Sequence, residues 1–142
     1  MTPAPFMSTF VAIALIPVAF LFTHAYLSGR KHLPYHTLTG MIGVIWDLSL
    51  SIFYMLYRLL GGQVEGSGLE VEGVLIAYFA IHGVIAMIVI ALEVSMLLTG
   101  VVQMRKKKTI GLHRKLSTPL YLFWFAAFLS GEAVYIVYYI LG

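Results

Sequence analysis

The sequence predicts an all-α integral membrane protein: a single domain, residues 1–142, built as a bundle of four antiparallel transmembrane helices. Of the 142 residues, 61% are hydrophobic and 11% are charged, so the chain has too few polar side chains to cover a soluble globule. Its apolar residues also fall in four blocks, each long enough to cross the roughly 30 Å hydrocarbon core of a bilayer. We expect spans at about residues 6–27, 36–60, 74–104 and 116–141.

The first expected span has no charged residue before Arg30 and lacks the basic start of a signal peptide, so we expect it to remain in the protein. A short turn leads to the second span, and a Gly-rich acidic loop at residues 61–73 precedes the third. The third run has about 31 residues, or about 46 Å at 1.5 Å per residue, and is expected to tilt or protrude. Aromatic residues at the span ends predict interfacial belts, with Tyr54, Tyr57, Trp124, Tyr135, Tyr138 and Tyr139 as the main members.

The basic residues predict the orientation. Arg30 and Lys31 lie in the first turn, and six of the nine basic residues lie in segment 105–115. Cytoplasmic loops collect Lys and Arg, so we expect a multi-pass protein of the bacterial cytoplasmic (inner) membrane with both termini outside the cytoplasm. Because the charges flank apolar spans, nucleic acid is not an expected partner. Anionic membrane lipid or a partner protein is expected to contact the cluster formed by Arg105, Lys106, Lys107 and Lys108.

Catalytic signatures are missing from the sequence. The chain has no cysteine, which excludes disulfides, thiolate metal sites and thiol catalysis. It also has no nucleophile elbow, phosphate-binding loop, His-Glu-x-x-His zinc motif or dinucleotide fingerprint. These observations favour a protein without catalytic activity of its own.

Ionisable residues inside spans are costly in lipid and are usually functional or paired. His36, Asp47 and Arg58 recur at intervals of eleven residues, about three helical turns, and therefore share one face of the second span; His82 and Glu93 repeat this spacing in the third. Asp47 and Glu93 lie about 16 Å from the basic ends, near the midplane. The two carboxyls could share a proton, hold a metal ion, or each be a protonated acid bonded to a neighbouring hydroxyl. If they face each other, at least one is expected to carry a proton at neutral pH.

A second polar layer is expected in the outer third of the membrane, with Arg58, His82 and Glu132 as its members. A structural ion pair is favoured over a binding site there, because removing one partner would leave an unpaired charge in lipid.

Histidines define a third layer at the basic ends. His24, His36 and His113 lie near the ends of three different spans, so their imidazoles come to about one depth. This arrangement predicts axial ligation of haem or chelation of copper or zinc. The alternative is a set of interfacial histidines that contact headgroups and helix ends. His82, about 35 Å away along its helix, could serve only a separate outer metal site.

Three segments resemble a known family. They are Ile81-His82-Gly83-Val84-Ile85-Ala86, Leu112-His113-Arg114-Lys115-Leu116 and Ser130-Gly131-Glu132-Ala133-Val134-Tyr135. Over residues 24–141 the chain resembles the small bacterial four-helix membrane proteins that include YozB and CtaM, whose best-described members are implicated in maturation of haem-copper terminal oxidases. The resemblance points to His36, His82 and His113. Glu93 and Glu132 depart from the family pattern, which has apolar or small residues there.

Two functional classes follow from the resemblance and the histidines. The first is an accessory subunit or assembly factor of a respiratory haem-copper oxidase or related electron-transfer complex, with haem or copper bound through histidines and respiratory subunits as partners. The second is a small b-type cytochrome that carries electrons from the quinol pool. In either class, replacing His36 or His113 by Ala is expected to abolish bound cofactor, whereas His32→Ala does little.

Overall fold

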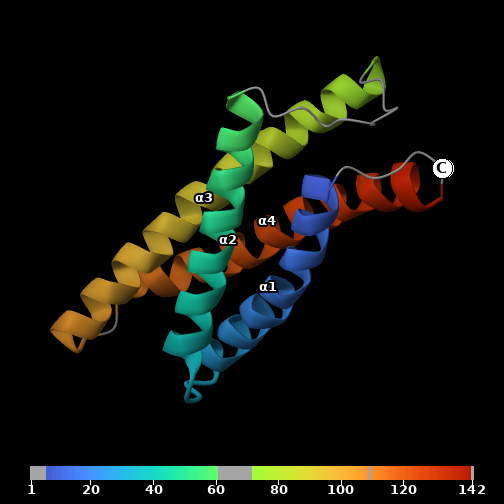
Figure 1. Cartoon of the computed structure of the whole chain (residues 1–142). Helices are drawn as coiled ribbons and strands as arrows, with labels where there is room; N and C mark the ends of the chain where they lie inside the picture. The colour runs from blue at the N-terminus through green and yellow to red at the C-terminus, as the bar shows by residue number, and fades with distance from the viewer. Residues whose placement is uncertain (1–5, 61–71, 109, 142) are drawn as a thin grey trace.

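The structure, a computed structural model, describes residues 6–60, 72–108 and 110–141, except for the side chains of Arg58 and Tyr138. These residues form four α-helices and no strand (Figure 1). The helices are α1 (Phe6–Arg30), α2 (His36–Leu59), α3 (Val74–Lys106) and α4 (Gly111–Tyr135), and a π-helical turn, η1 (Ile136–Ile140), continues α4. The predicted all-α fold is therefore confirmed. The main difference in bounds is at α4, which begins at Gly111 and not near Leu116.

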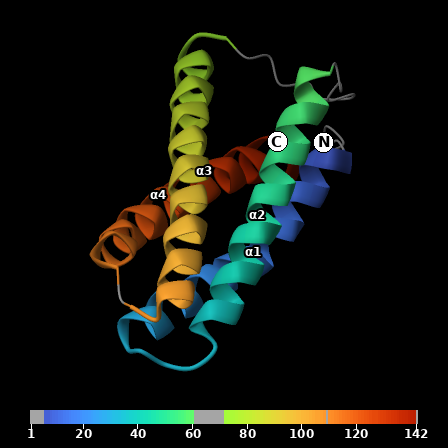
Figure 2. The same ribbon diagram turned by 90° about the vertical axis from the view of Figure 1, so that its left-hand side faces the viewer.

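The four helices pack in a ring. α1 packs along α2 and α3 along α4, and these two hairpins are joined by contacts of α1 with α4 and by fewer contacts of α2 with α3. In Figure 2 the turn at residues 31–35, the end of α3 and the start of α4 lie at the same end of the molecule, which we call the basic end. Toward the opposite end α2 and α3 diverge. The hairpin arrangement agrees with the antiparallel order expected from the sequence.

Local backbone chemistry ends the helices at the basic end. Between α1 and α2, His32 and Tyr35 adopt left-handed conformations with φ of 51° and 70°, and Pro34 has no amide hydrogen with which to continue a helix. α3 ends at Lys107, also left-handed, whose amide donates to the carbonyl oxygens of Gln103 and Met104. The Gln103 side chain then accepts a hydrogen bond of 3.0 Å from the amide of Ile110 and closes the link to α4.

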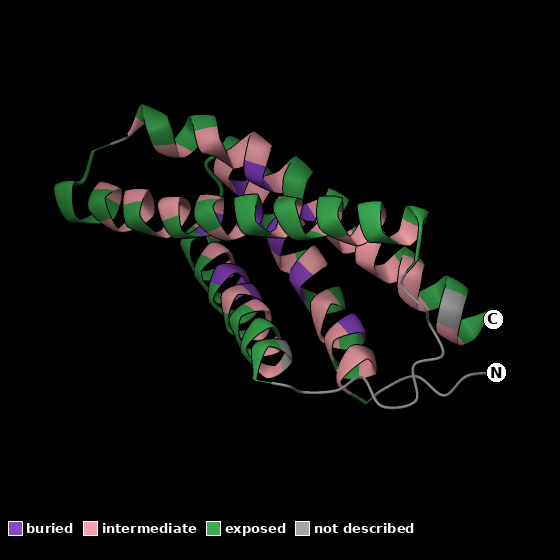
Figure 3. Ribbon diagram, turned by 90° about the horizontal axis from the view of Figure 1, so that it is seen from above, coloured by how far each residue is buried: buried purple, intermediate pink, exposed green. Residues whose placement is uncertain are grey.

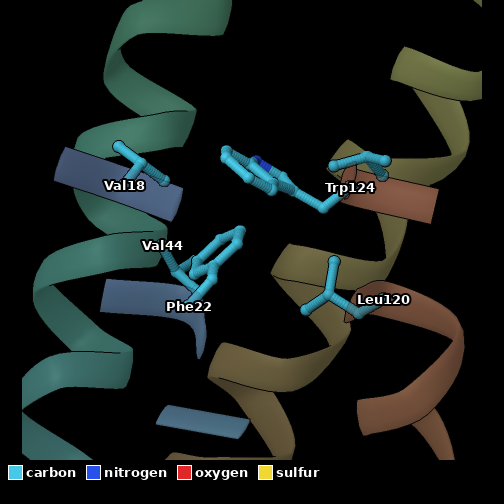
Figure 4. Packing of buried hydrophobic residues seen from close by; sticks show 6 residues of the cluster. Val18, Phe22, Val44, Leu120 and Trp124 are labelled. Atoms are coloured by element: carbon cyan, nitrogen blue, oxygen red, sulfur yellow. The ribbon is translucent and has the colours of Figure 1, made fainter. Parts of the chain in front are cut away.

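Few apolar side chains are buried. A small core lies where the four helices approach each other, and exposed residues, many of them large and apolar, occur along all four helices (Figure 3). Trp124 is at the centre of this core, with its ring 4.9 Å from that of Phe22 and 5.0 Å from that of Phe128. The core residues, most of which are drawn in Figure 4, are Val18, Phe22, Val44, Val89, Leu120 and Trp124.

Three helices have the length and composition needed to cross a membrane: Phe6–Arg30, His36–Tyr57 and Val74–Lys106. α4, expected as a fourth span, is not among them when the described residues are considered. Its sequence explains the difference, because His113, Arg114 and Lys115 occupy its first turns and Glu132 lies near its end. By length alone, its 25 residues extend about 37 Å.

Candidate functional site

Two histidines from different helices meet at the basic end. His36 is the first residue of α2, and His113 lies in the first turn of α4. Their ring centroids are 6.2 Å apart and their ring planes are inclined by 86°. Both side chains are partly buried. The structure thus brings together two of the three histidines expected at this depth.

The protonation of the His36 ring follows from its hydrogen bond. Nδ1 lies 2.7 Å from the carbonyl oxygen of Ala25 in α1. Because a carbonyl oxygen only accepts, Nδ1 must carry the hydrogen, and in the neutral ring Nε2 is left as the unprotonated nitrogen. The ring lies so close to α1 that a Cβ added at Gly29 would be 2.7 Å from its Cε1 atom. Only glycine leaves room for the ring at this position.

The same reasoning applies to His113. Its Nδ1 lies 2.9 Å from the hydroxyl oxygen of Thr99 in α3. Thr99 donates its single hydroxyl hydrogen within its own helix, most closely to Ser95 O at 2.8 Å, so its oxygen accepts a hydrogen bond from His113 Nδ1. With Nδ1 as the donor to Thr99, Nε2 is the unprotonated nitrogen of the neutral His113 ring.

The surroundings of His113 favour the neutral form of its ring. The residue precedes the apolar run that starts at Leu116. Burial of the ring, and then the neighbouring His36 ring, lower the pKa of His113 below its usual value. His113 is consequently neutral at pH 7, the form that binds metal ions.

His24 and His82 lie outside this pair. His24 is exposed, and its Nδ1 is 3.0 Å from the hydroxyl oxygen of Thr39. His82 contacts Ser130 in α4, with 2.7 Å between Nδ1 and Oγ. Within the described ranges, no group of three His, Cys, Asp or Glu side chains is arranged to hold a metal ion. The histidine site is thus a pair, and His24 does not complete a triad.

Two carboxyl groups are buried at the centre of the bundle. Asp47 is 3% exposed and Glu93 is 0% exposed. The side chains of Glu93 and Trp124 lie within hydrogen-bonding reach of the Asp47 carboxyl. Among the described N–H and O–H groups, none donates to either carboxyl oxygen of Glu93. The structure therefore places together the two acids that the sequence assigned to one depth.

Trp124 is the residue of this cluster that the sequence analysis missed. It was expected in an interfacial belt, but it is 3% exposed and lies in the core. It occupies the middle of α4, roughly 20 Å from the helix start at 1.5 Å per residue. A buried indole needs an acceptor for its N–H. Asp47 is expected at mid-depth and could be that acceptor, and this is the signal that could have identified Trp124 as a core residue.

The outer polar group is only partly described. The Arg58 side chain falls outside the described residues, so the expected ion pair is not described either. His82 hydrogen-bonds to Ser130, and the Tyr78 hydroxyl donates to Ser130 O at 2.6 Å. Glu132 is partly buried, two residues further along α4. What the structure describes here is a hydrogen-bonded junction between α3 and α4.

The expected lipid-contacting cluster lies at the end of α3. Its four side chains, Arg105, Lys106, Lys107 and Lys108, are all exposed at the basic end. They are therefore accessible to an anionic surface.

Comparison with known proteins gives no match to any protein-family model, curated protein or solved structure. The resemblance to the YozB and CtaM proteins therefore stays a prediction. The described residues form helices without strands, and three of these helices are long and apolar enough to cross a membrane. They also contain a histidine pair at one end and a buried carboxyl pair at the centre.

Proposed function

We propose that this is an integral protein of the bacterial cytoplasmic membrane with four spans. Large apolar side chains are exposed along all four helices, whereas soluble monomers rarely expose continuous apolar surface of this extent. α4 packs along α3 and has the length of a span, which supports its inclusion. The basic residues of both turns lie at one end, which supports a cytoplasmic basic end, with Arg105 to Lys108 on anionic lipid and both termini on the other side.

We further propose that His36 and His113 bind one metal centre, copper or haem iron, through their Nε2 atoms. The observation that carries this proposal is the 6.2 Å separation of the two ring centroids. Bonds between a metal ion and a histidine nitrogen are about 2.0–2.1 Å long, so two histidines that hold one ion must have their rings within a few ångströms of each other. The observed separation of the ring centroids is short enough for both rings to reach one ion.

The hydrogen bonds of the pair also support a metal site. Metal-binding histidines usually donate their second ring N–H to a carbonyl or another oxygen, which fixes the ring orientation and tautomer. Ala25 O and Thr99 Oγ1 serve this purpose for His36 and His113. The bound metal would supply electron transfer or cofactor delivery, while the chain's own residues orient the two rings.

The physiological role we propose is that of a non-enzymatic accessory subunit or assembly factor of a respiratory haem-copper oxidase or related complex. The family resemblance and the lack of catalytic motifs in the sequence support it. The second candidate is a b-type cytochrome oxidised and reduced by partners of the quinol pool, since two imidazoles are also the axial ligands that a haem b requires.

A visible absorption spectrum and a metal analysis of the full chain, purified from membranes in mild detergent, test the proposal. A colourless protein with about one copper per chain that copurifies with oxidase subunits supports the accessory role. A Soret band that shifts on addition of dithionite supports the cytochrome. A protein that retains neither metal nor haem, and takes up neither Cu(I) nor haem added in solution, overturns the metal site.

A further inference from the structure

The buried carboxyl pair lies outside the proposed metal site. Asp47 is eleven residues beyond His36 on α2, a distance of about 16 Å along the helix. Glu93 is the largest fully buried side chain among the described residues, and it comes from α3. The two carboxyls meet at mid-bundle, beside the core tryptophan of α4.

Glu93 lacks the hydrogen-bond donors that an ionised carboxylate needs. Its two oxygens accept no hydrogen bond from any described donor. An ionised carboxylate without donors or a counter-charge costs several kcal/mol or more when removed from water. Within the described part of the chain, the buried polar side chains are Ser28, Asp47 and Glu93, so no buried base neutralises it.

Asp47 has a different environment. The Trp124 indole lies within hydrogen-bonding reach of its carboxyl, and an indole N–H only donates. The indole can therefore act on the Asp47 carboxyl only as a donor, which favours the negative charge on Asp47. The second polar side chain within reach of Asp47 is Glu93.

Two facing carboxyl groups can hydrogen-bond to each other only if one of them carries a hydrogen, because ionised carboxylates only accept. If both were ionised, two negative charges would meet inside an apolar core, and such a pair cannot ionise fully at low cost. The buried hydrophobic core of the bundle consists of apolar side chains, with Val44 on α2 and Val89 on α3 one turn away from the two acids; its other members include Val18 and Phe22 on α1 and Leu120 on α4. None of these core residues can titrate or supply a charge.

We propose that Asp47 and Glu93 form a proton-binding site that holds one proton, with Glu93 as the acid and Asp47 as the carboxylate. Glu93 donates its O–H to Asp47, which also accepts from the indole of Trp124. Loss of the proton breaks the Glu93 O–H bond, passes H⁺ to water or another base, and leaves the pair with two negative charges. The site is a reversible proton store inside the bundle, and it does not depend on metal binding at the histidine pair.

Infrared spectroscopy of the purified full chain at pH 7 tests this assignment directly. A protonated carboxylic acid has a C=O band that a carboxylate lacks, and exposed acids are ionised at this pH. We expect an acid band that belongs to the buried pair. It should shift when glutamate is labelled with ¹³C at the side-chain carboxyl, and it should not shift when aspartate is labelled in the same way. This comparison needs no variant.

Three variants locate the proton. Glu93→Gln, which keeps the shape of the side chain, should remove the band completely, because Asp47 then accepts from the amide and from Trp124. Asp47→Asn should keep the band at a changed frequency, because Glu93 stays protonated beside a new partner. Glu132→Gln is the matched control and should leave the band in place.

Several outcomes overturn the proposal. A spectrum without an acid band at pH 7 shows that both groups are ionised. A band that shifts only with labelled aspartate puts the proton on Asp47 and contradicts the role of Trp124. A band lost in Glu132→Gln and kept in Glu93→Gln assigns the proton to the outer layer instead.

Discussion

His36 and His113 lie with their ring centroids 6.2 Å apart, and each ring is anchored to a different neighbouring helix. His36 in α2 donates to Ala25 O in α1, and His113 in α4 donates to Thr99 Oγ1 in α3. The pair thus links all four helices at the basic end. Both Nδ1 hydrogens are used in these links, so the two Nε2 atoms are the nitrogens left for a ligand.

The first prediction concerns the ligands themselves. His36→Ala and His113→Ala should each lower bound metal or haem from about one per chain to near zero, because a single imidazole seldom retains a metal ion against buffer. Metal analysis and the absorption spectrum of the purified variants provide the measurement. His32→Ala is the control, since His32 is exposed in the turn between α1 and α2. Full cofactor content in both ligand variants would eliminate the site.

The second prediction concerns the space around His36. Gly29→Ala places a methyl group 2.7 Å from His36 Cε1, so the ring must move, at a cost of about 1–3 kcal/mol. We expect a lower unfolding midpoint in detergent and weaker metal binding. Gly83→Ala is the matched control, because a Cβ there meets nothing within 4 Å and alanine is the better helix former. Equal midpoints for Gly29→Ala and Gly83→Ala would show that the ring is not packed as described.

The third prediction concerns pH. Burial and the His36 ring lower the pKa of His113, so the metal-free folded protein binds a proton at His113 only below the usual value of about 6.5. The unfolded chain binds that proton more readily, and stability therefore rises with pH and levels off above about pH 6.5. His36→Gln removes one cause of the shift and should raise the His113 midpoint. Histidine-selective NMR titration gives both midpoints.

An unchanged His113 midpoint in His36→Gln would contradict the electrostatic coupling of the two rings. A midpoint at or above the usual value in the unsubstituted protein would contradict the burial of His113.

Depth along a helix could be predicted from the sequence, because a rise of 1.5 Å per residue is independent of packing. For this reason Asp47 and Glu93 were assigned to one level, as were His36 and His113. What faces each side chain could not be predicted in this way. Ala25 O and Thr99 Oγ1 become partners only when α1 and α3 cross at particular residues, and a backbone carbonyl leaves no trace in the sequence.

Trp124 shows a second limit of the sequence. An aromatic residue belongs to an interfacial belt only if it lies at the depth of the lipid headgroups and its side chain faces outward. Trp124 instead lies in the middle of α4, on the side of the Phe22 ring. His24 shows a third, because equal depth on three helices did not bring its ring into the pair; it faces Thr39 instead. In both cases the rotation of a helix about its own axis decides the contact, and no single helix sequence specifies that rotation.

The last prediction separates orientation of the ligand from ligation. Thr99→Val removes the acceptor for His113 Nδ1–H and keeps the side-chain volume, so the ring loses the partner that fixes its tautomer and direction. Loss of such a partner typically weakens metal affinity by about 10–100-fold, measured by competition with a chelator of known affinity. Thr99→Ser should restore affinity because it keeps the hydroxyl, and Thr37→Val, at an exposed position of α2, should change nothing. If Thr99→Val binds metal as tightly as the unsubstituted chain, the hydrogen bond between Thr99 and His113 serves only to pack α3 against α4, and His113 needs no orienting partner.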